Sequence, residues 1–371
     1  MNIAILGSRG FPSTYGGYET LVRHLARDWS QRGHTVTVYC RSRDGDRRSW
    51  ITEGVRCQWT PGRDSTSLST LSFGASSHLH ATSQRYDAAL VLNVANGYFL
   101  PLLRARRIPC AVNTDGVEWE RLKWGAAAQK VFLGGAKLCA RYADVLIADS
   151  QAIAGIWADR FGVESRFIPY GAPVLTDVSH DRVEALGLVR SGYALVVARL
   201  IPENNVELFL DAIAVMPSSP RAVVVGSANY CSPLELRLRE LDHRGAIRWL
   251  GHVSDQELLT QLWANCGVYV HGHSVGGTNP GLLQALGAGA PTLVLDTVFN
   301  REVVGQDGPL YPHDAHVLAR RMADLLGDAE LRQELANRGR CIIKQRYDWT
   351  AVCDGYLEAI KSTRLVAAAR R

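Results

Sequence analysis

Short apolar runs alternate with amphipathic stretches along most of the 371 residues. Residues 2–6 form the first apolar run, residues 18–33 have the apolar spacing of one helical face, and residues 35–40 form the next run. A buried strand, a helix and a second buried strand in this order make a βαβ unit, whose strands run parallel. The alternation therefore predicts an α/β fold with parallel, Rossmann-like sheets.

The alternation comes in two sets, separated by a charged stretch without a clear strand pattern at residues 173–191. A chain of this length can build two cores. We therefore expect two facing domains with a cleft between them. The N-terminal domain is predicted over residues 1–175 and the C-terminal domain over residues 190–345. A last helix, predicted within residues 346–371, is expected to cross back to the first domain.

Composition excludes several other classes of protein. Hydrophobic residues make up 47% and charged residues 21% of the chain, which is ordinary for a globular protein. No apolar run reaches the ~18 residues of a membrane span, and the N-terminus lacks a secretion signal, so a cytoplasmic location is expected. The net charge of +5 permits an anionic partner, but no nucleic-acid recognition motif is present. The eight cysteines lack metal-binding spacing and are expected to be reduced.

Residues 271–291 are the richest candidate for ligand binding. They follow the apolar run 266–270, pass through Gly276 and Gly277, and continue as a helix-like run that stops before Pro291. A strand, a glycine turn and a helix N-terminus form a ready anion site, because the glycines let the backbone approach a phosphate and the first N–H groups of the helix point at it. Taken alone, these residues fit an ordinary strand-to-helix turn slightly better.

Two further candidates follow strands of the first set. Gly16 and Gly17 place flexible backbone at a helix start. There is no GxGxxG motif and no acidic residue at the end of the second strand, so a nicotinamide cofactor is not expected. Asp115 comes directly after a strand, where α/β enzymes place reactive groups. An aspartate before glycine is also a common turn or cap residue.

A series of motifs in a fixed order adds to this interpretation. The chain reads LGSRGFPSTYGGYET from residue 6, NTDGVEWERLKW from residue 113, VVARLIPENN from residue 196, HSVGGTNPGLLQALGAGAP from residue 273 and RYDWT from residue 346. Together these motifs resemble the retaining GT-B glycosyltransferases of family 4, in a subgroup of bacterial enzymes that includes rhamnosyltransferases. The resemblance runs over essentially the whole chain and implies two facing Rossmann-like domains.

The resemblance implies that a sugar linked to dTDP, UDP or GDP binds in the cleft, mainly to the C-terminal domain. Arg199 would face the diphosphate as a charge-assisted hydrogen-bond donor. The other implied donor contacts come from the main chain near His252 and Val253, from the turn Gly277, Thr278 and Asn279, from Gln284, and from Gly16 and Gly17.

Three positions depart from the pattern of the wider family. That family has two glutamates where this chain has Gly276 and Gln284, and a lysine where this chain has Asn204. The amide of Gln284 can still hydrogen-bond a ribose hydroxyl, but without charge each bond is weaker by ~0.5–1 kcal/mol. Arg199 or Arg9 would then have to neutralise the leaving diphosphate.

The expected chemistry is the transfer of a hexose, such as rhamnose, with retention. Charge gathers on the leaving diphosphate, so arginines and aimed N–H groups would supply most of the catalysis. Asp115 is the candidate to orient or deprotonate the acceptor hydroxyl. Glu203 would contact the sugar or fix Arg199, unless it is a solvated charge at a helix N-terminus. No DxD pair suited to a metal-bound diphosphate is present, so neither an essential metal nor another cofactor is expected.

The acceptor is expected to be a glycan or a lipid-linked molecule of cell-surface polysaccharide or glycoconjugate biosynthesis. Basic residues with interleaved aromatics at 104–141 could rest on anionic lipid at the inner face of the cell membrane. A solvated helix face with a buried stripe is the commoner meaning of such a run. Two other functions stay open: an inactive nucleotide-sugar-binding protein, because of the three departures, and a sugar-nucleotide 2-epimerase on the same architecture.

Overall fold

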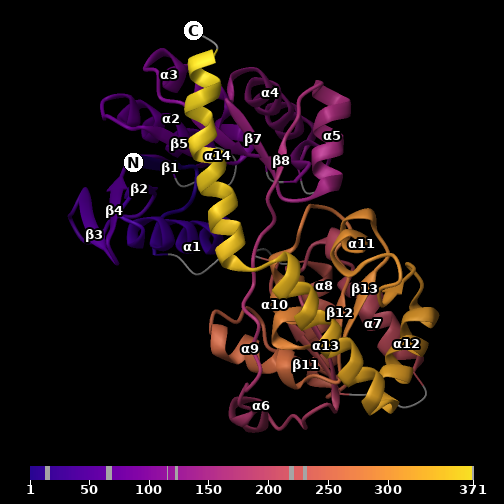
Figure 1. The fold of residues 1–371 in the computed structure, drawn as a ribbon. Coiled ribbons are helices and arrows are strands. Elements are labelled where there is room, and N and C mark those ends of the chain that lie inside the picture. The colour runs from indigo at the N-terminus through magenta and orange to yellow at the C-terminus, as the bar shows by residue number, and fades with distance from the viewer. Residues whose placement is uncertain are drawn as a thin grey trace. The chain divides into compact units, whose positions relative to one another are not determined.

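The computed structural model describes residues 1–12, 17–63, 69–114, 116–121, 124–216, 221–228 and 232–369. The chain forms two compact units, coloured from indigo to yellow along the sequence in Figure 1. Unit 1 comprises Met1–Tyr170 and Trp349–Arg371, and unit 2 comprises Gly171–Asp348. Each unit is a mainly parallel sheet with helices, so the expected α/β fold with two Rossmann-like domains is confirmed.

The unit boundaries lie at Tyr170 and Trp349 rather than at residues 175 and 346. Hydrogen bonds explain the first shift, because the N–H of Ala172 donates to the Tyr347 carbonyl and that of Leu175 donates to the Gly287 carbonyl. The segment that follows Tyr170 is therefore fastened to unit 2 before any regular element begins.

Unit 1 contains an eight-stranded sheet in the order β3-β4-β2-β1-β5-β6-β7-β8. All neighbouring strands in it are parallel except β3 and β4, which form an antiparallel hairpin. The strands are β1 (Asn2–Leu6), β2 (Thr35–Cys40), β3 (Ser49–Thr52), β4 (Val55–Trp59), β5 (Ala88–Leu92), β6 (Cys110–Asn113), β7 (Val145–Ala148) and β8 (Arg166–Phe167).

The β3–β4 hairpin was not predicted from the sequence. Its turn consists of Glu53 and Gly54, both with positive φ (52° and 77°). Two such residues are what a tight hairpin turn requires. A glycine after a polar residue, between runs with β-branched and aromatic side chains, was the available signal.

The helices of unit 1 are α1 (Gly17–Gln31), α2 (Ser69–Thr82), α3 (Leu100–Ala105), α4 (Ala126–Tyr142), α5 (Gln151–Phe161) and α14 (Trp349–Ala369), with 3-10 turns η1 (Val94–Phe99) and η2 (Glu118–Glu120). The last helix, α14, is drawn in yellow in Figure 1 and packs against α1, β5, β6 and β7. The Trp29 indole donates to the Cys353 carbonyl at 3.3 Å, and the Asn113 amide donates to the Tyr356 hydroxyl. Residues at the chain's end thus complete the core formed by its beginning.

Unit 2 contains a six-stranded sheet in the order β11-β10-β9-β12-β13-β14, in which every pair is parallel. The strands are β9 (Tyr193–Val197), β10 (Arg221–Val225), β11 (Ile247–Trp249), β12 (Val268–His271), β13 (Thr292–Leu295) and β14 (Leu310–Tyr311). The helices are α6 (Asp181–Ala185), α7 (Val206–Val215), α8 (Pro233–His243), α9 (Gln256–Asn265), α10 (Pro280–Ala288), α11 (Val298–Val304), α12 (Ala315–Gly327) and α13 (Ala329–Arg346).

Both faces of this sheet are buried. Ala194 and Val196 of β9 pack into a cluster with α7 and α12, while Tyr193 and Leu195 pack into a second cluster with α9 and α10. Successive side chains of a strand point to opposite faces, so a strand covered on both sides must be apolar throughout. That is why β9 reads as a continuous apolar run.

Candidate functional site

The strand order of unit 2 reverses between β9 and β12. The chain runs from β9 outward to β10 and β11, and then returns to the other side of β9 as β12. In open parallel sheets a crevice forms at the carboxyl ends of the strands where the order reverses, and ligands bind there. The loops after β9 and β12 contain Arg199 and the glycine turn 276–279, so the fold brings these two sequence candidates to one edge.

Arg199 lies two residues beyond the end of β9 and is exposed. Its guanidinium makes no ion pair or hydrogen bond with any residue that the structure describes. Its carbonyl accepts a hydrogen bond from the Asn204 side chain at 2.8 Å. Asn204 is 3% exposed, so the amide that stands in place of a lysine braces the loop from inside. The arginine side chain stays available for an anionic ligand.

The turn that follows Arg199 is joined to the loop after β12. The Glu203 carbonyl, in the 3-10 turn η3 (Pro202–Asn204), accepts from both the N–H and the hydroxyl of Ser274 at 2.9 Å. The Asn205 amide donates to the Gly272 carbonyl at 2.7 Å. A Cβ on Gly272 would lie 2.6 Å from the Asn204 carbonyl oxygen. The two loops therefore form one packed surface, and only glycine permits that approach.

Glu203 is buried, with 7% of its surface exposed. A solvated charge at a helix N-terminus is therefore not its state. Its carboxylate does not pair with Arg199, since no ion pair joins them among the described residues.

The glycine turn leads into α10 as the sequence predicted. Gly276 has a φ of 118°, which favours glycine, and Thr278 is 3% exposed. Asn279 caps the helix, since its side-chain oxygen accepts from the Gly281 N–H at 2.9 Å. Pro280 has no N–H. Two of the first three helical positions thus lack a free donor, so an anion here would have to use N–H groups of the turn, including that of Gly277.

Gln284 is half-buried on α10, among fully buried neighbours. The half-buried positions of this helix are Pro280, Gly281 and Gln284. Residues spaced by three or four share one helical face. Gln284 therefore lies on the face that begins at the glycine turn, as the motif series implies.

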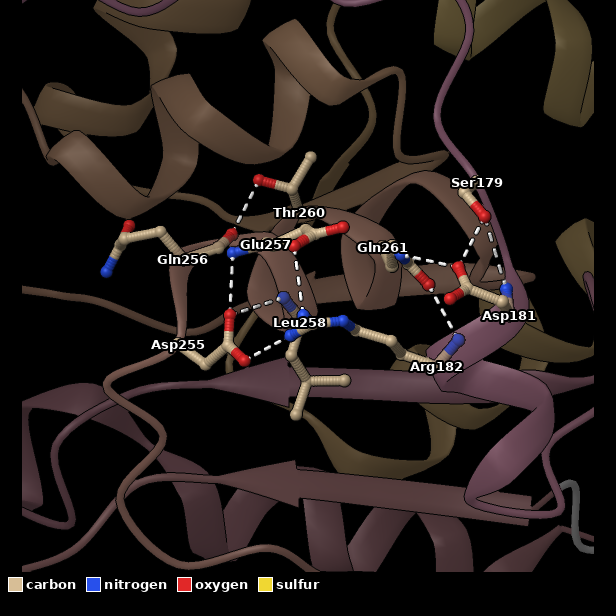
Figure 2. A network of polar contacts seen from close by, with 9 residues as sticks. All are labelled: Ser179, Asp181, Arg182, Asp255, Gln256, Glu257, Leu258, Thr260 and Gln261. Atoms are coloured by element: carbon tan, nitrogen blue, oxygen red, sulfur yellow. Dashed lines mark hydrogen bonds and ion pairs between the residues drawn. The ribbon is translucent and has the colours of Figure 1, made fainter.

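The loop after β11 contains the other predicted contact, His252 and Val253, which are exposed and half-buried respectively. Figure 2 shows what fixes the chain just beyond it. The Asp255 carboxylate accepts from the N–H groups of Glu257 and Leu258 at 3.0 and 3.2 Å and pairs with the Arg182 guanidinium. These bonds hold the start of α9 in place.

The same network reaches α6. The Arg182 N–H donates to the Gln261 side chain at 3.0 Å, and the Gln261 amide donates to Asp181 at 2.9 Å (Figure 2). Hydrogen bonds to Ser179 and Gln261 lower the pKa of Asp181. The network is a brace between α6 and α9, and the loop at His252 is positioned by it.

Gly226 directly follows β10 and lies against the loop that carries Arg199. Its N–H donates to the Gly251 carbonyl at 2.7 Å, and its φ is 141°. A Cβ there would lie 1.8 Å from the Ala198 carbonyl oxygen. The loop that carries Arg199 can therefore approach residue 226 this closely only because that residue has no side chain.

We expect Gly226→Ala to lower the free energy of unfolding of unit 2 by roughly 3 kcal/mol or more, from backbone strain and overpacking together. Gly245→Ala is the matched control. Gly245 also has a positive φ (70°) but nothing within 4 Å of a Cβ, so a cost of about 1 kcal/mol is expected. Urea unfolding monitored by circular dichroism measures both, and equal costs would contradict the close approach.

His271, the last residue of β12, lies under the site rather than in it. It is fully buried, its Nδ1 is 3.2 Å from the Tyr269 hydroxyl, and its ring stacks on His273 with centroids 4.4 Å apart. Burial, and secondarily the neighbouring His273, lower the pKa of His271 well below 6.5. It is therefore a neutral packing residue at neutral pH.

The candidates of unit 1 are partly outside the described residues. Gly16 and Asp115 both lie outside them, whereas Gly17 begins α1 and is half-buried. Glu19, in the same motif, is 7% exposed and accepts a hydrogen bond from the Arg9 N–H at 3.1 Å. Sequence reasoning gave Glu19 no role, although the motif contained it. The bond ties the loop after β1 to the first turn of α1.

The chain next to Asp115 is well anchored. The N–H and hydroxyl of Thr114 both donate to the Ile147 carbonyl, at 2.9 and 3.1 Å. A few residues on, the buried Glu118 carboxylate accepts from Arg121 at 2.7 Å and from the Trp124 indole at 2.8 Å. The end of β6 is thus held at the carboxyl edge of the sheet. Arg121 belongs to this internal bracing, not to the exposed basic surface.

Two absences concern the described part of the chain. No group of three or more His, Cys, Asp or Glu side chains there could hold a metal ion. None of the helices described has the length and apolarity that spanning a bilayer requires.

Two protein families match the chain in sequence. A family described as "Glycosyltransferase Family 4" matches residues 15–173, and one described as "Glycosyl transferases group 1" matches residues 184–341. Each family covers one set of the alternating elements, and together they leave few residues unmatched. No protein of curated function matches the sequence closely enough to count as a relative.

Several solved structures share the fold. Sucrose-phosphate synthase from Thermosynechococcus elongatus superposes with a TM-score of 0.83, at 18% identity and 99% coverage of both chains. Anabaena HepE in complex with UDP-glucose gives 0.76, at 18% identity, covering 98% of this chain and 100% of that one. Starch synthase IV from Arabidopsis thaliana, bound to ADP and acarbose, gives 0.75 at 13% identity, covering 98% and 99%. At such low identity the likeness is one of fold.

Proposed function

Because the chain belongs to the family 4 glycosyltransferases of the GT-B type, we propose that it moves a hexose from a nucleoside diphosphate to a glycan or lipid-linked acceptor. The observation that carries the proposal is the reversal point of unit 2. There Arg199, an exposed arginine that has no ion pair with any described residue, stands on a loop that is hydrogen-bonded to the loop leading into the glycine turn 276–279. A cation and main-chain N–H groups at one sheet edge suit a diphosphate.

The proposed reaction proceeds with retention of the anomeric configuration. As the bond to the donor phosphate breaks, negative charge gathers on the diphosphate, and Arg199 with the N–H groups of the turn stabilises that charge. The acceptor hydroxyl attacks from the same face, and Asp115 accepts its proton with help from the departing phosphate. Asp115 orients that hydroxyl, and the buried Glu203 holds a sugar hydroxyl.

No metal or other cofactor is part of this proposal. The positive charge that the leaving group needs comes from Arg199, which is exposed. Turnover that survives treatment with EDTA would agree with this assignment, and loss of turnover restored by Mg²⁺ would contradict it.

The donor is proposed to be a dTDP-, UDP- or GDP-linked sugar, with rhamnose first on the basis of the motif series. Anabaena HepE was solved with UDP-glucose, which supports screening UDP-linked sugars beside dTDP-rhamnose. A thermal-shift screen distinguishes them, because a ligand at 100 times its dissociation constant stabilises by roughly 2.7 kcal/mol. The sugar that stabilises most is then offered with acceptors, and NMR of the product reports the anomeric configuration.

The same experiment separates the rival functions. Tight donor binding without transfer or hydrolysis would indicate an inactive binding protein, which Gly276, Gln284 and Asn204 make a specific alternative. Conversion of the donor to its epimer without any acceptor would indicate a sugar-nucleotide 2-epimerase. Transfer that needs an acceptor supports the proposal.

Gln284→Glu is expected to tighten donor binding two- to fivefold. A carboxylate makes hydrogen bonds to a ribose hydroxyl that are stronger by ~0.5–1 kcal/mol than those of an amide. Isothermal titration with the nucleoside diphosphate measures the change. Gln333→Glu, at an exposed position on α13, is the matched control and should leave affinity unchanged. Weaker binding in the first variant would place Gln284 beside the phosphates instead.

A further inference from the structure

Four neighbouring elements of unit 1, all of them described, together contain cations and no aspartate or glutamate. The elements α2, η1, α3 and α4 pack against one another, and the labels of α2, α3 and α4 lie close together in Figure 1. None of the four contains aspartate or glutamate. Six exposed cations lie on or directly after them: Arg104, Arg106, Arg107, Lys130, Lys137 and Arg141. We refer to this surface as the basic face.

The cations of the basic face converge. On α4, Lys130, Lys137 and Arg141 are spaced by seven and four residues, which puts them on one stripe. Arg104 of α3 reaches the same stripe, since its guanidinium carbon is 5.9 Å from the centre of the Tyr142 ring while that of Arg141 is 5.5 Å away. The surface is therefore continuous from α3 to α4.

Exposed apolar side chains lie on the same elements as these cations. Leu79 of α2 is 64% exposed, Leu102 of α3 38% and Val131 of α4 37%. Tyr98 of η1 is 39% exposed, and its hydroxyl donates to the Val131 carbonyl at 3.0 Å. Apolar side chains beside cations are the combination with which a protein surface enters the boundary of a bilayer.

Some of the exposed cations elsewhere in the molecule are paired with carboxylates. Examples are the ion pairs Arg160–Glu120, Arg237–Asp211, Arg244–Glu240 and Arg301–Asp296. None of the six cations of the basic face has an ion pair with a residue in the described ranges. An ordinary solvated helix face would carry both signs of charge, and this one does not.

We propose that the basic face docks the protein on an anionic lipid bilayer. The cations are attracted to lipid phosphates within about a Debye length of the surface, and the apolar side chains enter the boundary between headgroups and acyl chains. The inference extends the proposed function, because it places the enzyme at the surface where a lipid-linked acceptor resides. Leucine and valine between the cations favour lipid over nucleic acid, whose phosphates would need cations alone.

The test is co-sedimentation of the full chain with vesicles of phosphatidylcholine, with and without phosphatidylglycerol. We expect binding only to the anionic vesicles, weakened by salt. Each cation near such a surface changes affinity about fivefold, so the triple variant Lys130→Gln, Lys137→Gln, Arg141→Gln should bind roughly a hundredfold more weakly. The control replaces three exposed cations of unit 2 that have no ion pair, as Arg190→Gln, Arg320→Gln and Lys344→Gln.

Three results would overturn the proposal. These are no binding to anionic vesicles by the unaltered protein, equal losses in the two triple variants, and a preference for heparin or DNA over vesicles. Leu102→Ser with Val131→Ser tests the apolar part, and should reduce binding several-fold at high salt, where the cations are screened. Vesicle binding needs no donor, and donor-induced stabilisation of the same variants needs no vesicles. Failure of the docking surface is thus distinguishable from failure of the transferase proposal.

Discussion

Arg199→Ala is expected to abolish the stabilisation that a nucleoside diphosphate sugar gives to the folded protein. The side chain is exposed and has no partner among the described residues, so its guanidinium is free to bind phosphate oxygens. A charge-assisted hydrogen bond contributes roughly 1.5–3 kcal/mol, which is about a ten- to hundredfold loss of donor affinity. Because the bond strengthens as the diphosphate leaves, kcat should also fall by about 10²–10³.

The loop itself should survive this substitution. Asn204 holds the Arg199 carbonyl and Ser274 holds the Glu203 carbonyl, and neither bond uses the arginine side chain. Thermal unfolding without ligand should therefore be unchanged. Arg190→Ala removes another exposed arginine of unit 2 and should keep the full donor response. If Arg199→Ala retains the thermal shift, Arg199 does not contact the diphosphate.

Asp115→Asn is expected to keep donor binding and to lose transfer by about 10²–10⁴, the usual contribution of a positioned base. The amide has the shape of the carboxylate but cannot accept a proton. Asp115 itself is outside the described residues, but Thr114 before it is fully buried and bonded to Ile147. That anchor holds the end of β6 at the carboxyl edge of the unit 1 sheet.

Single-turnover transfer and donor-induced thermal shift, measured on the same preparation, separate the two roles. Asp159→Asn on α5 is the matched control, because Asp159 is exposed and lies away from the carboxyl edge of the sheet. It should leave both measurements unchanged. Unimpaired transfer in Asp115→Asn would return Asp115 to the role of a turn residue, and a lost thermal shift would mean that it acts on the donor.

The fold was predictable because a strand that is buried on both faces is apolar at nearly every position, and such a run is visible in the sequence. β12 is a nearly continuous apolar run followed by glycine, and the predicted run 266–270 lies within two residues of its observed ends. The β3–β4 hairpin was missed because β3 lies at the sheet edge, where its residues are exposed or only half-buried. Short exposed strands carry little of the apolar periodicity on which such predictions depend.

The site was predictable in its location but less so in its bonding. The motifs placed Arg199, Gly277 and Gln284 near one another, and the reversal of strand order supplies the physical reason. Nothing in the sequence told that the Asn204 amide would turn inward to a carbonyl, or that the Glu203 side chain would be buried. These outcomes depend on which loop a residue meets, and the partner of η3 is a loop about 70 residues further along the chain.

The sequence by itself determined the two sets of parallel strands, the glycine turn before α10 and the excess of cations between residues 104 and 141. Those features are local, because they follow from the spacing of apolar residues and from the backbone freedom of glycine. The tertiary structure alone decided which cations are exposed and which are paired with a buried carboxylate. It paired Arg121 with the buried Glu118, left Lys130 and Arg141 on a surface without acids, and set Gly226 against Ala198. The charge of a side chain is fixed by its chemistry, but its partners are fixed only when distant segments pack.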